Sequence, residues 1–291
     1  MQIVYHLRVH GTDDDRMVKT LLHNRDWLHK NETEVLTPNR LRGVFDEALA
    51  ALQGGSATPA MEQIMLDAIL ESDHSDRVIC SMPGFIGAMS KAVSPKGLYP
   101  GAAARMAAMA NLFPSAETEF FLALKNPVTL LQSLLTMAPI GNFDMLMRGV
   151  DPYRLRWAPV IRRIVQSLQG RRLVIWRHED MPLIWPEIVR LIAQMPPEVP
   201  LRDGLSFIHD LISEQGRASL EKALAERDQL TIAARRDICI QHLAQYALPA
   251  RVSEEITLPG WTQAMVDEIT GQYLADTAEI AVLPGVEYVM P

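Results

Sequence analysis

The chain has 291 residues, 48% hydrophobic and 22% charged, which is enough apolar material for one large α/β domain with or without a helical elaboration. Its formal net charge of −7 disfavours nucleic acid or an anionic membrane surface as the main partner, because both attract a basic face. The two cysteines, Cys80 and Cys239, show no metal-ligand or disulfide spacing, and neither a leader pattern nor a membrane-length apolar run occurs, so we expect a cytoplasmic protein with free thiols.

The first predicted element is a strand over residues 2–9, "QIVYHLRV", whose β-rich, continuously apolar character is typical of a central strand covered on both faces. Thr12 then offers a helix N-cap, and Asp15 stands three residues later, as in a capping box. Residues 17–30 carry apolar side chains at helical spacing. We therefore predict a strand, a tight turn and a helix.

Helices and strands then alternate along the chain, which predicts a parallel sheet with right-handed crossovers. The helices are expected over residues 38–52, 59–72, 101–113, 128–138 and 158–170, and the strands over residues 76–81, 116–127 and 171–180. The remaining predicted elements are a charged helical stretch over 213–247, an amphipathic helix over 261–283, and a "PPEVP" run at 196–200 that marks a boundary or a rigid loop.

These elements predict an α/β fold, a parallel central sheet flanked by helices, in a single domain over residues 1–291 with a helical portion from about 200 to 291. Ligands of such sheets bind beyond the carboxyl ends of the strands. Three of these ends carry polar residues: 10–15, 125–126 and 177–180. The site should lie among them.

Four blocks of the sequence resemble bacterial sulfotransferase-like proteins. "IVYHLRVHGTDDDRMVKTLLHNRDWL" is similar to that family's opening, a strand of the form hHhGxHKTGTTSLQ followed by a helix with an NRxxL pattern. "FFLALKNPVTLLQSLL" resembles the segment that binds the 3′-phosphate of the donor, with Lys125 in the place of an arginine and Ser133 eight positions later. "RRLVIWRHEDMPLIWPEIVRLIA" and "YLADTAEIAVLPGVEYV" resemble later parts of the family. The resemblance implies that the "HED" at 178–180 is mainly an organising turn and helix start.

The resemblance implies a P-loop-like fold that binds 3′-phosphoadenosine-5′-phosphosulfate (PAPS) or adenosine 3′,5′-bisphosphate. A sulfuryl group in transfer spreads negative charge over its oxygens, so its site needs backbone N–H groups at a helix N-terminus and a cation. The residues placed in this site by the resemblance are Gly11, Thr12, Asp13, Asp14, Asp15, Arg16, Lys125 and Ser133.

The first half of this site departs from the family pattern. Aligned on His10, the family's Lys-Thr-Gly-Thr-Thr is replaced by residues 11–15, Gly-Thr-Asp-Asp-Asp, so the cation is lost and carboxylates take the place of the interior glycine and both hydroxyls. Such a turn should resist a phosphosulfate. Arg8 or Arg16 could supply the missing cation, and a divalent cation bridging Asp13 to Asp15 is an alternative.

Each candidate also has a structural interpretation. The three aspartates could simply cap the helix and favour its dipole, Lys125 could form a surface ion pair, and Ser133 could bond back within its helix. His10 is the candidate general base for an acceptor hydroxyl, and the alternative is a histidine hydrogen-bonded at the rim of the sheet.

Three hypotheses about function follow. The leading one is a sulfotransferase-like enzyme that moves a sulfuryl group from PAPS to a hydroxyl or amine of a small-molecule or glycan acceptor. The second is a catalytically inactive binding or scaffold protein of the same fold, and the third is a metal-assisted phosphotransferase that uses the aspartates. The GxSxG and GxxxxGK[ST] signatures are absent, which disfavours a serine hydrolase and an ordinary P-loop NTPase.

Overall fold

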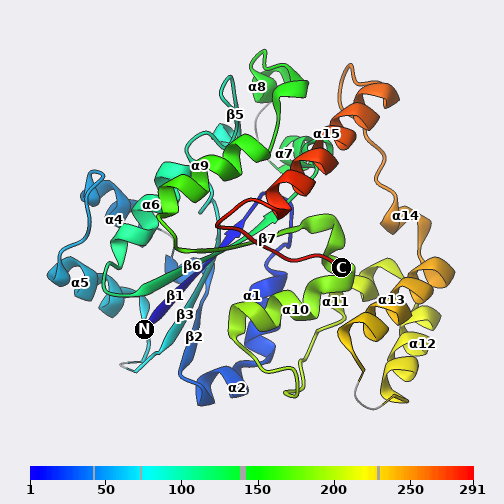
Figure 1. Ribbon diagram of the computed structural model, residues 1–291, viewed down its shortest axis with the longest axis horizontal. Helices are drawn as coiled ribbons and strands as arrows, with labels where there is room; N and C mark the ends of the chain where they lie inside the picture. The colour runs from blue at the N-terminus through cyan, green and yellow to red at the C-terminus, as the bar shows by residue number, and fades with distance from the viewer. Residues whose placement is uncertain (42, 73, 138–141, 228–229) are drawn as a thin grey trace.

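The computed structural model describes residues 1–41, 43–72, 74–137, 142–227 and 230–291, and is built around a six-stranded, all-parallel sheet (Figure 1). The strand order is β2-β3-β1-β6-β7-β8, with β1 and β6 at the centre. The strands span β1 Gln2–Arg8, β2 Thr33–Leu36, β3 Arg77–Pro83, β6 Glu117–Leu124, β7 Arg172–Arg177 and β8 Glu287–Tyr288, and the short β4 Val93–Ser94 and β5 Gly97–Leu98 form a separate antiparallel pair. The predicted fold class is confirmed.

Helices cover both faces of this sheet (Figure 1). One face packs against α1 (Arg16–His23), α2 (Arg25–Lys30) and α10 (Met181–Ala193) through a hydrophobic cluster. The other face carries a larger cluster beneath the remaining flanking helices. These are α3 Pro38–Leu41, α4 Val44–Leu52, α5 Pro59–Ile69, α6 Ala102–Leu112, α7 Pro127–Met137, α8 Phe143–Met147, α9 Ala158–Leu168 and α15 Gln263–Ala281.

The central position of β1 follows from its composition. Ile3, Val4, Tyr5 and Leu7 are fully buried, and they alternate between the two hydrophobic clusters, so both faces of the strand are covered. Its backbone pairs in register with β3 on one side and with β6 on the other. As predicted, the first segment of the chain is therefore an interior strand.

Several element boundaries differ from the prediction. The helix expected over 38–52 is two helices, because Gly43 adopts a φ of +86° immediately before α4. The helical stretch expected over 213–247 is also two helices, α12 (Glu214–Ala225) and α13 (Ile232–Tyr246). Ala138, the last residue of the predicted helix over 128–138, lies outside the described residues.

Two strands of the six-stranded sheet, β2 and β8, were not predicted, and neither was the separate pair of β4 and β5. β2 has only four residues, "TEVL", and pairs at the edge of the sheet with β3 alone. β8 has two residues, which pair with β7 after α15 has returned the chain to the sheet. Segments this short carry too few side chains for an alternating pattern to be recognised.

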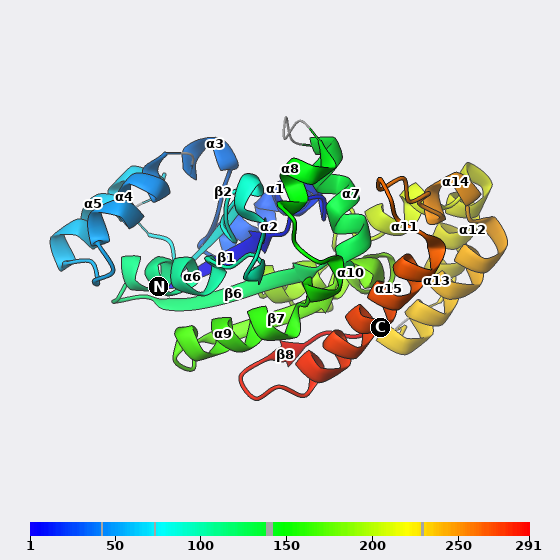
Figure 2. The same cartoon turned by 90° about the horizontal axis from the view of Figure 1, so that it is seen from above.

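The helical C-terminal portion, which was predicted, gathers at one end of the molecule (Figure 2). It comprises α11 (Ser206–Leu211), α12, α13 and α14 (Pro249–Val252), with a small apolar cluster of its own. Arg235 of α13 attaches it to α10, where Arg235 Nη2 donates to Leu183 O at 2.6 Å and to Glu187 Oε1 at 2.7 Å. The hairpin of α12 and α13 begins and ends at one point, because Ile212 and Ala247 form an antiparallel bridge. Among the described residues, no helix has the length and apolarity needed to cross a bilayer.

Candidate functional site

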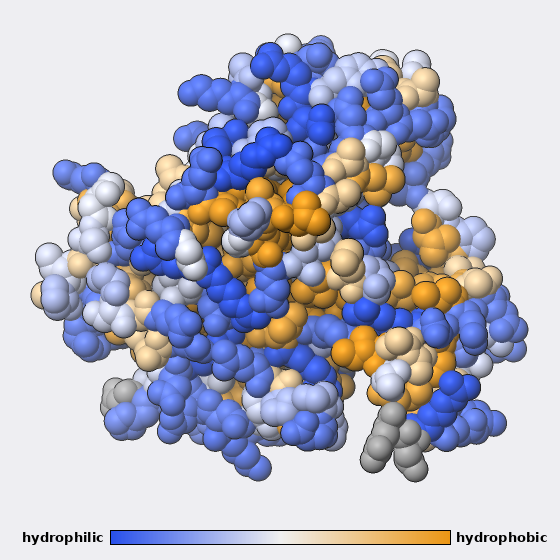
Figure 3. All heavy atoms as spheres, in the orientation of Figure 1, coloured by the Kyte–Doolittle hydropathy of each residue, from blue (hydrophilic) through white to orange (hydrophobic). Residues whose placement is uncertain are grey.

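A cleft of about 590 Å³ opens at the carboxyl edge of the sheet. After β1 the chain turns toward one face of the sheet, and after the neighbouring β6 it turns toward the other face. The cleft lies between these two turns, which is where open parallel sheets bind their ligands. One wall comes from the turns that follow β1, β6 and β7, and the other from α11, α14 and the segment that leads into α15. A notch separates the region of α14 from the body of the protein in the space-filling view (Figure 3).

The turn after β1 is held together by ion pairs of its own residues. Arg8, the last residue of β1, places its Nε 2.7 Å from Asp13 Oδ1 and also forms an ion pair with Asp15. The other carboxylate oxygen of Asp13 accepts the backbone N–H of Met17 at 3.2 Å, in the first turn of α1. Arg8 and Asp13 are 8% and 4% exposed. A carboxylate of the chain itself therefore occupies the N-terminus of α1, where a bound anion would otherwise sit.

The predicted capping box is wrong. Thr12 is not the N-cap, because its hydroxyl donates to Val9 O at 2.7 Å and the helix begins only at Arg16. Asp15 precedes the helix in the left-handed region, with a φ of 65°, and its side chain does not cap the helix. The physical reason is Arg8: its guanidinium draws Asp13 and Asp15 toward the end of β1, and this delays the start of the helix.

The segment after β6 brings three predicted site residues together. Lys125 Nζ donates to Gly11 O and to Ser133 Oγ, each at 2.7 Å. Gly11 has a φ of +72°, and a Cβ added to it would lie 2.6 Å from Ser133 Cβ, so only glycine fits this position. The Lys125 ammonium, which enters from the neighbouring strand, would lie 3.1 Å from a Cβ added to Gly11 and is thus next to the turn after β1.

Lys125 is held in a strongly desolvated position, with only 7% of the residue exposed. Burial lowers the pKa of its ammonium, whereas the nearby carboxylates of Glu254, Glu179 and Asp14 act in the opposite direction. Trp157 Nε1 donates to Lys125 O at 2.8 Å and fixes the end of β6. Two of the three ammonium protons have acceptors among the described residues, and the side chain lines the cleft.

Glu179 anchors Asn126, the residue that follows Lys125. Its carboxylate accepts the backbone N–H of Asn126 and the hydroxyl of Tyr273, each at 2.8 Å. The adjacent Asp180 forms a bidentate pair with Arg177, at 2.7 and 2.6 Å. The "HED" therefore has the organising role expected for residues 179 and 180, and it also ties β7 to the Lys125 segment.

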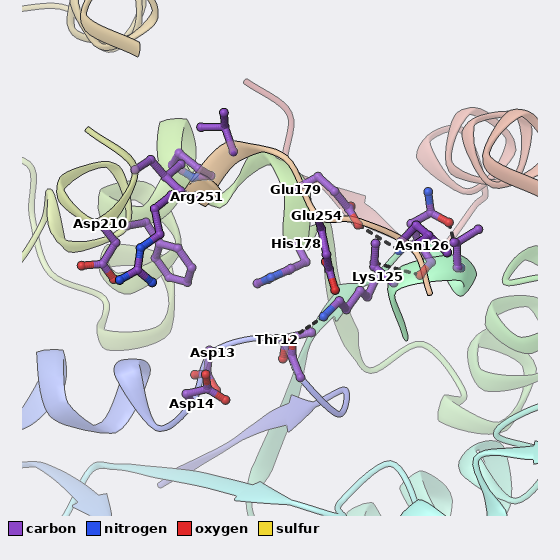
Figure 4. Close-up of a pocket in the computed structure, with 18 of the residues that line it drawn as sticks. Thr12, Asp13, Asp14, Lys125, Asn126, His178, Glu179, Asp210, Arg251 and Glu254 are labelled. Atoms are coloured by element: carbon purple, nitrogen blue, oxygen red, sulfur yellow. Dashed lines mark hydrogen bonds between the residues drawn. The ribbon is translucent and has the colours of Figure 1, made fainter. Parts of the chain in front are cut away.

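The structure does not bring His10 into the cleft. Its Nδ1 shares a 2.8 Å hydrogen bond with the hydroxyl of Tyr99, and the two rings stack. Burial lowers the pKa of His10 to about 4. His178 lines the cleft instead and points into it (Figure 4). Burial and the Lys125 charge lower the pKa of His178 to about 3, so it is neutral near pH 7.

The wall from the C-terminal portion was not predicted from the sequence. Arg16 crosses to it: its guanidinium forms an ion pair with Asp210 and lies 4.3 Å from the centre of the Phe207 ring. Arg251 and Glu254 complete this wall (Figure 4). These residues lie more than 80 positions after Lys125 and belong to no motif. Three basic and five acidic side chains line the cleft, an excess of two negative charges.

Within the described ranges, no group of three or more histidine, cysteine, aspartate or glutamate side chains is arranged to hold a metal ion. A scan against protein-family models and a search of curated proteins found no match to this chain. The sulfotransferase resemblance therefore stays a prediction, based on the sequence blocks described above.

Proposed function

We propose that this chain is a binding protein on a sulfotransferase-like architecture, whose cleft takes an adenosine 3′,5′-bisphosphate-type ligand without sulfuryl transfer. One phosphate of the ligand would contact Lys125 and Ser133. The observation that carries this proposal is the cluster in which Lys125 Nζ lies 2.7 Å from both Ser133 Oγ and Gly11 O. A buried ammonium beside a hydroxyl, at the edge of a cleft, suits a phosphate oxygen.

The turn after β1 argues against transfer. The 5′-phosphosulfate would need free N–H groups and a cation there, but Asp13 already holds the N–H of Met17, and Arg8 is engaged by Asp13 and Asp15. A phosphosulfate entering this turn would meet these carboxylates first, so the proposed ligand would be held through its phosphate at Lys125 and Ser133 instead. Of the three functions considered, binding without catalysis is the one that agrees with this arrangement.

Sulfuryl transfer is the second candidate, favoured by the presence of His178 in the cleft. In that reaction the S–O bond to the phosphate of PAPS breaks while a bond from sulfur to the acceptor oxygen or nitrogen forms. The acceptor proton passes to a base, and adenosine 3′,5′-bisphosphate leaves. His178 rather than His10 would be placed to take the proton, although a base with a pKa of about 3 holds it weakly.

Calorimetric titration with adenosine 3′,5′-bisphosphate, with and without magnesium, tests the proposal. We expect saturable binding without metal, weakened at least tenfold in Lys125→Ala, which is about 1.4 kcal/mol of binding free energy. Lys19→Ala, an exposed position on α1, is the matched control and should bind as the wild type does. Absence of binding at millimolar ligand would overturn the proposal.

Two further results would favour the other functions. Transfer of a ³⁵S-labelled sulfuryl group from PAPS to any acceptor in a mixed panel would establish the enzyme. Binding that requires magnesium and is abolished in Asp13→Ala would favour the phosphotransferase.

We also propose a cytoplasmic location, as expected from the sequence. Cys80 and Cys239 are both buried free thiols, which is compatible with a reducing compartment. Fractionation of cells that express the tagged chain would test this location.

A further inference from the structure

Lys125 and Glu254 face each other across the cleft without closing into an ion pair. In the close-up, the Glu254 carboxylate descends between His178 and Lys125 (Figure 4). Both residues line the same cavity, yet no contact within 4.0 Å joins their charged atoms in the described part of the chain. The acceptors of the Lys125 ammonium are instead Gly11 O and Ser133 Oγ.

The Glu254 carboxylate is hydrogen-bonded to Gln132 of α7. Gln132 Nε2 donates to Glu254 Oε1 and to Glu255 O, and Gln132 Oε1 accepts the N–H of Thr257, each at 2.9 Å. The side-chain amide thereby clamps the segment 253–262 that leads from α14 to α15. Glu254 Oε1 is therefore engaged by Gln132, and the side chain lines the cleft without an ion pair to Lys125 in the described part of the chain.

We infer that the cleft selects a zwitterionic phosphate ester, whose phosphate contacts Lys125 and whose protonated amine contacts Glu254. This inference rests on the proposed function, because it places the anionic group of the ligand at Lys125. It adds the cationic group and names Glu254 as the residue that selects it.

The charges of the cleft support a ligand of both signs. Asp13 and Asp210 each have an arginine partner, whereas Glu254, Glu179 and Asp14 have no cationic partner among the described residues. A phosphate bound at Lys125 would lie near the Glu254 carboxylate, whose repulsion weakens the binding of an ester that lacks a positive charge. An amine on the same ligand turns this repulsion into attraction, so that one molecule satisfies both unclosed charges.

The experiment compares ethyl phosphate with phosphoethanolamine, which differ by the amine, in ligand-observed ³¹P NMR titrations. For the wild type we expect phosphoethanolamine to bind about fivefold more tightly, the effect of one partly exposed ion pair. Glu254→Gln should abolish this preference. The glutamine carbonyl can still accept from Gln132, so the clamp is retained in this variant.

Glu255→Gln is the matched control. Only the backbone carbonyl of Glu255 takes part in the clamp, so this variant removes a neighbouring charge and should keep the fivefold preference. Equal binding of the two phosphates to a wild type that binds adenosine 3′,5′-bisphosphate would overturn this inference and leave the proposed function intact. Failure of all three ligands to bind would overturn both. A preference that persists in Glu254→Gln would show that another residue recognises the amine.

Discussion

The turn after β1 and the segment after β6 occupy equivalent positions, each at the carboxyl end of a central parallel strand, yet they treat charge in opposite ways. In the first, Arg8 is paired with both Asp13 and Asp15, so its charge is used within the turn and the carboxylates remain in excess. In the second, Lys125 is held by neutral acceptors, and its charge remains available to the cleft. Location within the fold thus indicates where an anion could bind, and local pairing decides whether it can.

The position of Arg8 accounts for two of the three aspartates in the turn, Asp13 and Asp15. An arginine at the end of a buried central strand needs anionic partners nearby, because an unpaired buried charge is strongly unfavourable. Asp13 and Asp15 supply them, whereas Asp14 is exposed and has no cationic partner among the described residues. The acidic turn is therefore the counterpart of Arg8.

The largest effect is expected at Asp13. Asp13→Ala removes a buried partner of Arg8 and the acceptor of the Met17 N–H, so we expect the free energy of unfolding to fall by about 4 kcal/mol. Asp14→Ala, at an exposed position, should change it by less than about 0.5 kcal/mol. Urea denaturation measures both. Equal effects in the two variants would show that the turn is not held by Arg8; should Asp13→Ala fail to fold, Asp13→Asn serves in its place.

The contact between the two regions is tested at Gly11. In Gly11→Ala, the added Cβ would lie 2.6 Å from Ser133 Cβ, and the alanine would have to adopt a φ of +72°. We therefore expect this variant to lower the free energy of unfolding by about 3 kcal/mol. Gly170→Ala is the control: its φ is +86°, but nothing lies within 4 Å, so only the backbone term of about 1 kcal/mol is expected. Similar losses at the two positions would contradict the close approach of Lys125 and Ser133 to the turn.

A pH effect should appear at His10, which flanks the turn. Its pKa is about 4 in the folded protein and 6.5 when unfolded, so the unfolded chain binds the proton more tightly. The stabilisation is fully present above pH 6.5 and is lost as the pH falls through 4, about 3 kcal/mol between pH 7 and pH 4. His10→Gln should lose less stability over that interval, in urea denaturation at the two pH values, whereas His29→Gln, at an exposed position, should behave as the wild type. An unchanged pH dependence in His10→Gln would show that His10 is not buried in its neutral form.

The smallest effect is expected on the β6 side. Ser133→Ala removes one acceptor of the Lys125 ammonium, and we expect a loss of about 1 kcal/mol in the free energy of unfolding together with weaker binding of adenosine 3′,5′-bisphosphate. Thr136→Ala, whose hydroxyl donates to Gln132 O one turn back in α7, should leave binding unchanged. Binding that survives in Ser133→Ala at full strength would remove the serine from the site.

Some of this arrangement could be predicted from the sequence. Strand-length apolar runs and their alternation with helices are local patterns, and they sufficed for β1, β3, β6 and β7 and for the parallel sheet. The short edge strands β2 and β8 were missed because their formation depends on neighbours already in place. Lys125 was found because it closes a central strand at the binding edge.

The remaining features of the site depend on contacts between distant parts of the chain. The ion pairs of Arg8 decide the course of residues 11–15, and pattern rules favoured a capping box that this arginine prevents. Glu254 and Gln132 meet across 122 positions. Nothing in either local segment indicates that a glutamine amide will engage a glutamate that lines the cleft.

The bridge between Ile212 and Ala247 bears on which part of the chain can tolerate changes in its sequence. Ser213 N donates to Tyr246 O at 2.9 Å, and Leu248 N donates to Leu211 O at 2.8 Å, so the chain leaves for α12 and returns from α13 at one point. This is the geometry of an insertion, because the two ends of the hairpin are joined by backbone hydrogen bonds. Exposed positions of the hairpin can therefore be exchanged, provided that Arg235 keeps its contacts with α10 and the apolar side chains of α12 and α13 stay packed on Ile208 and Ile212.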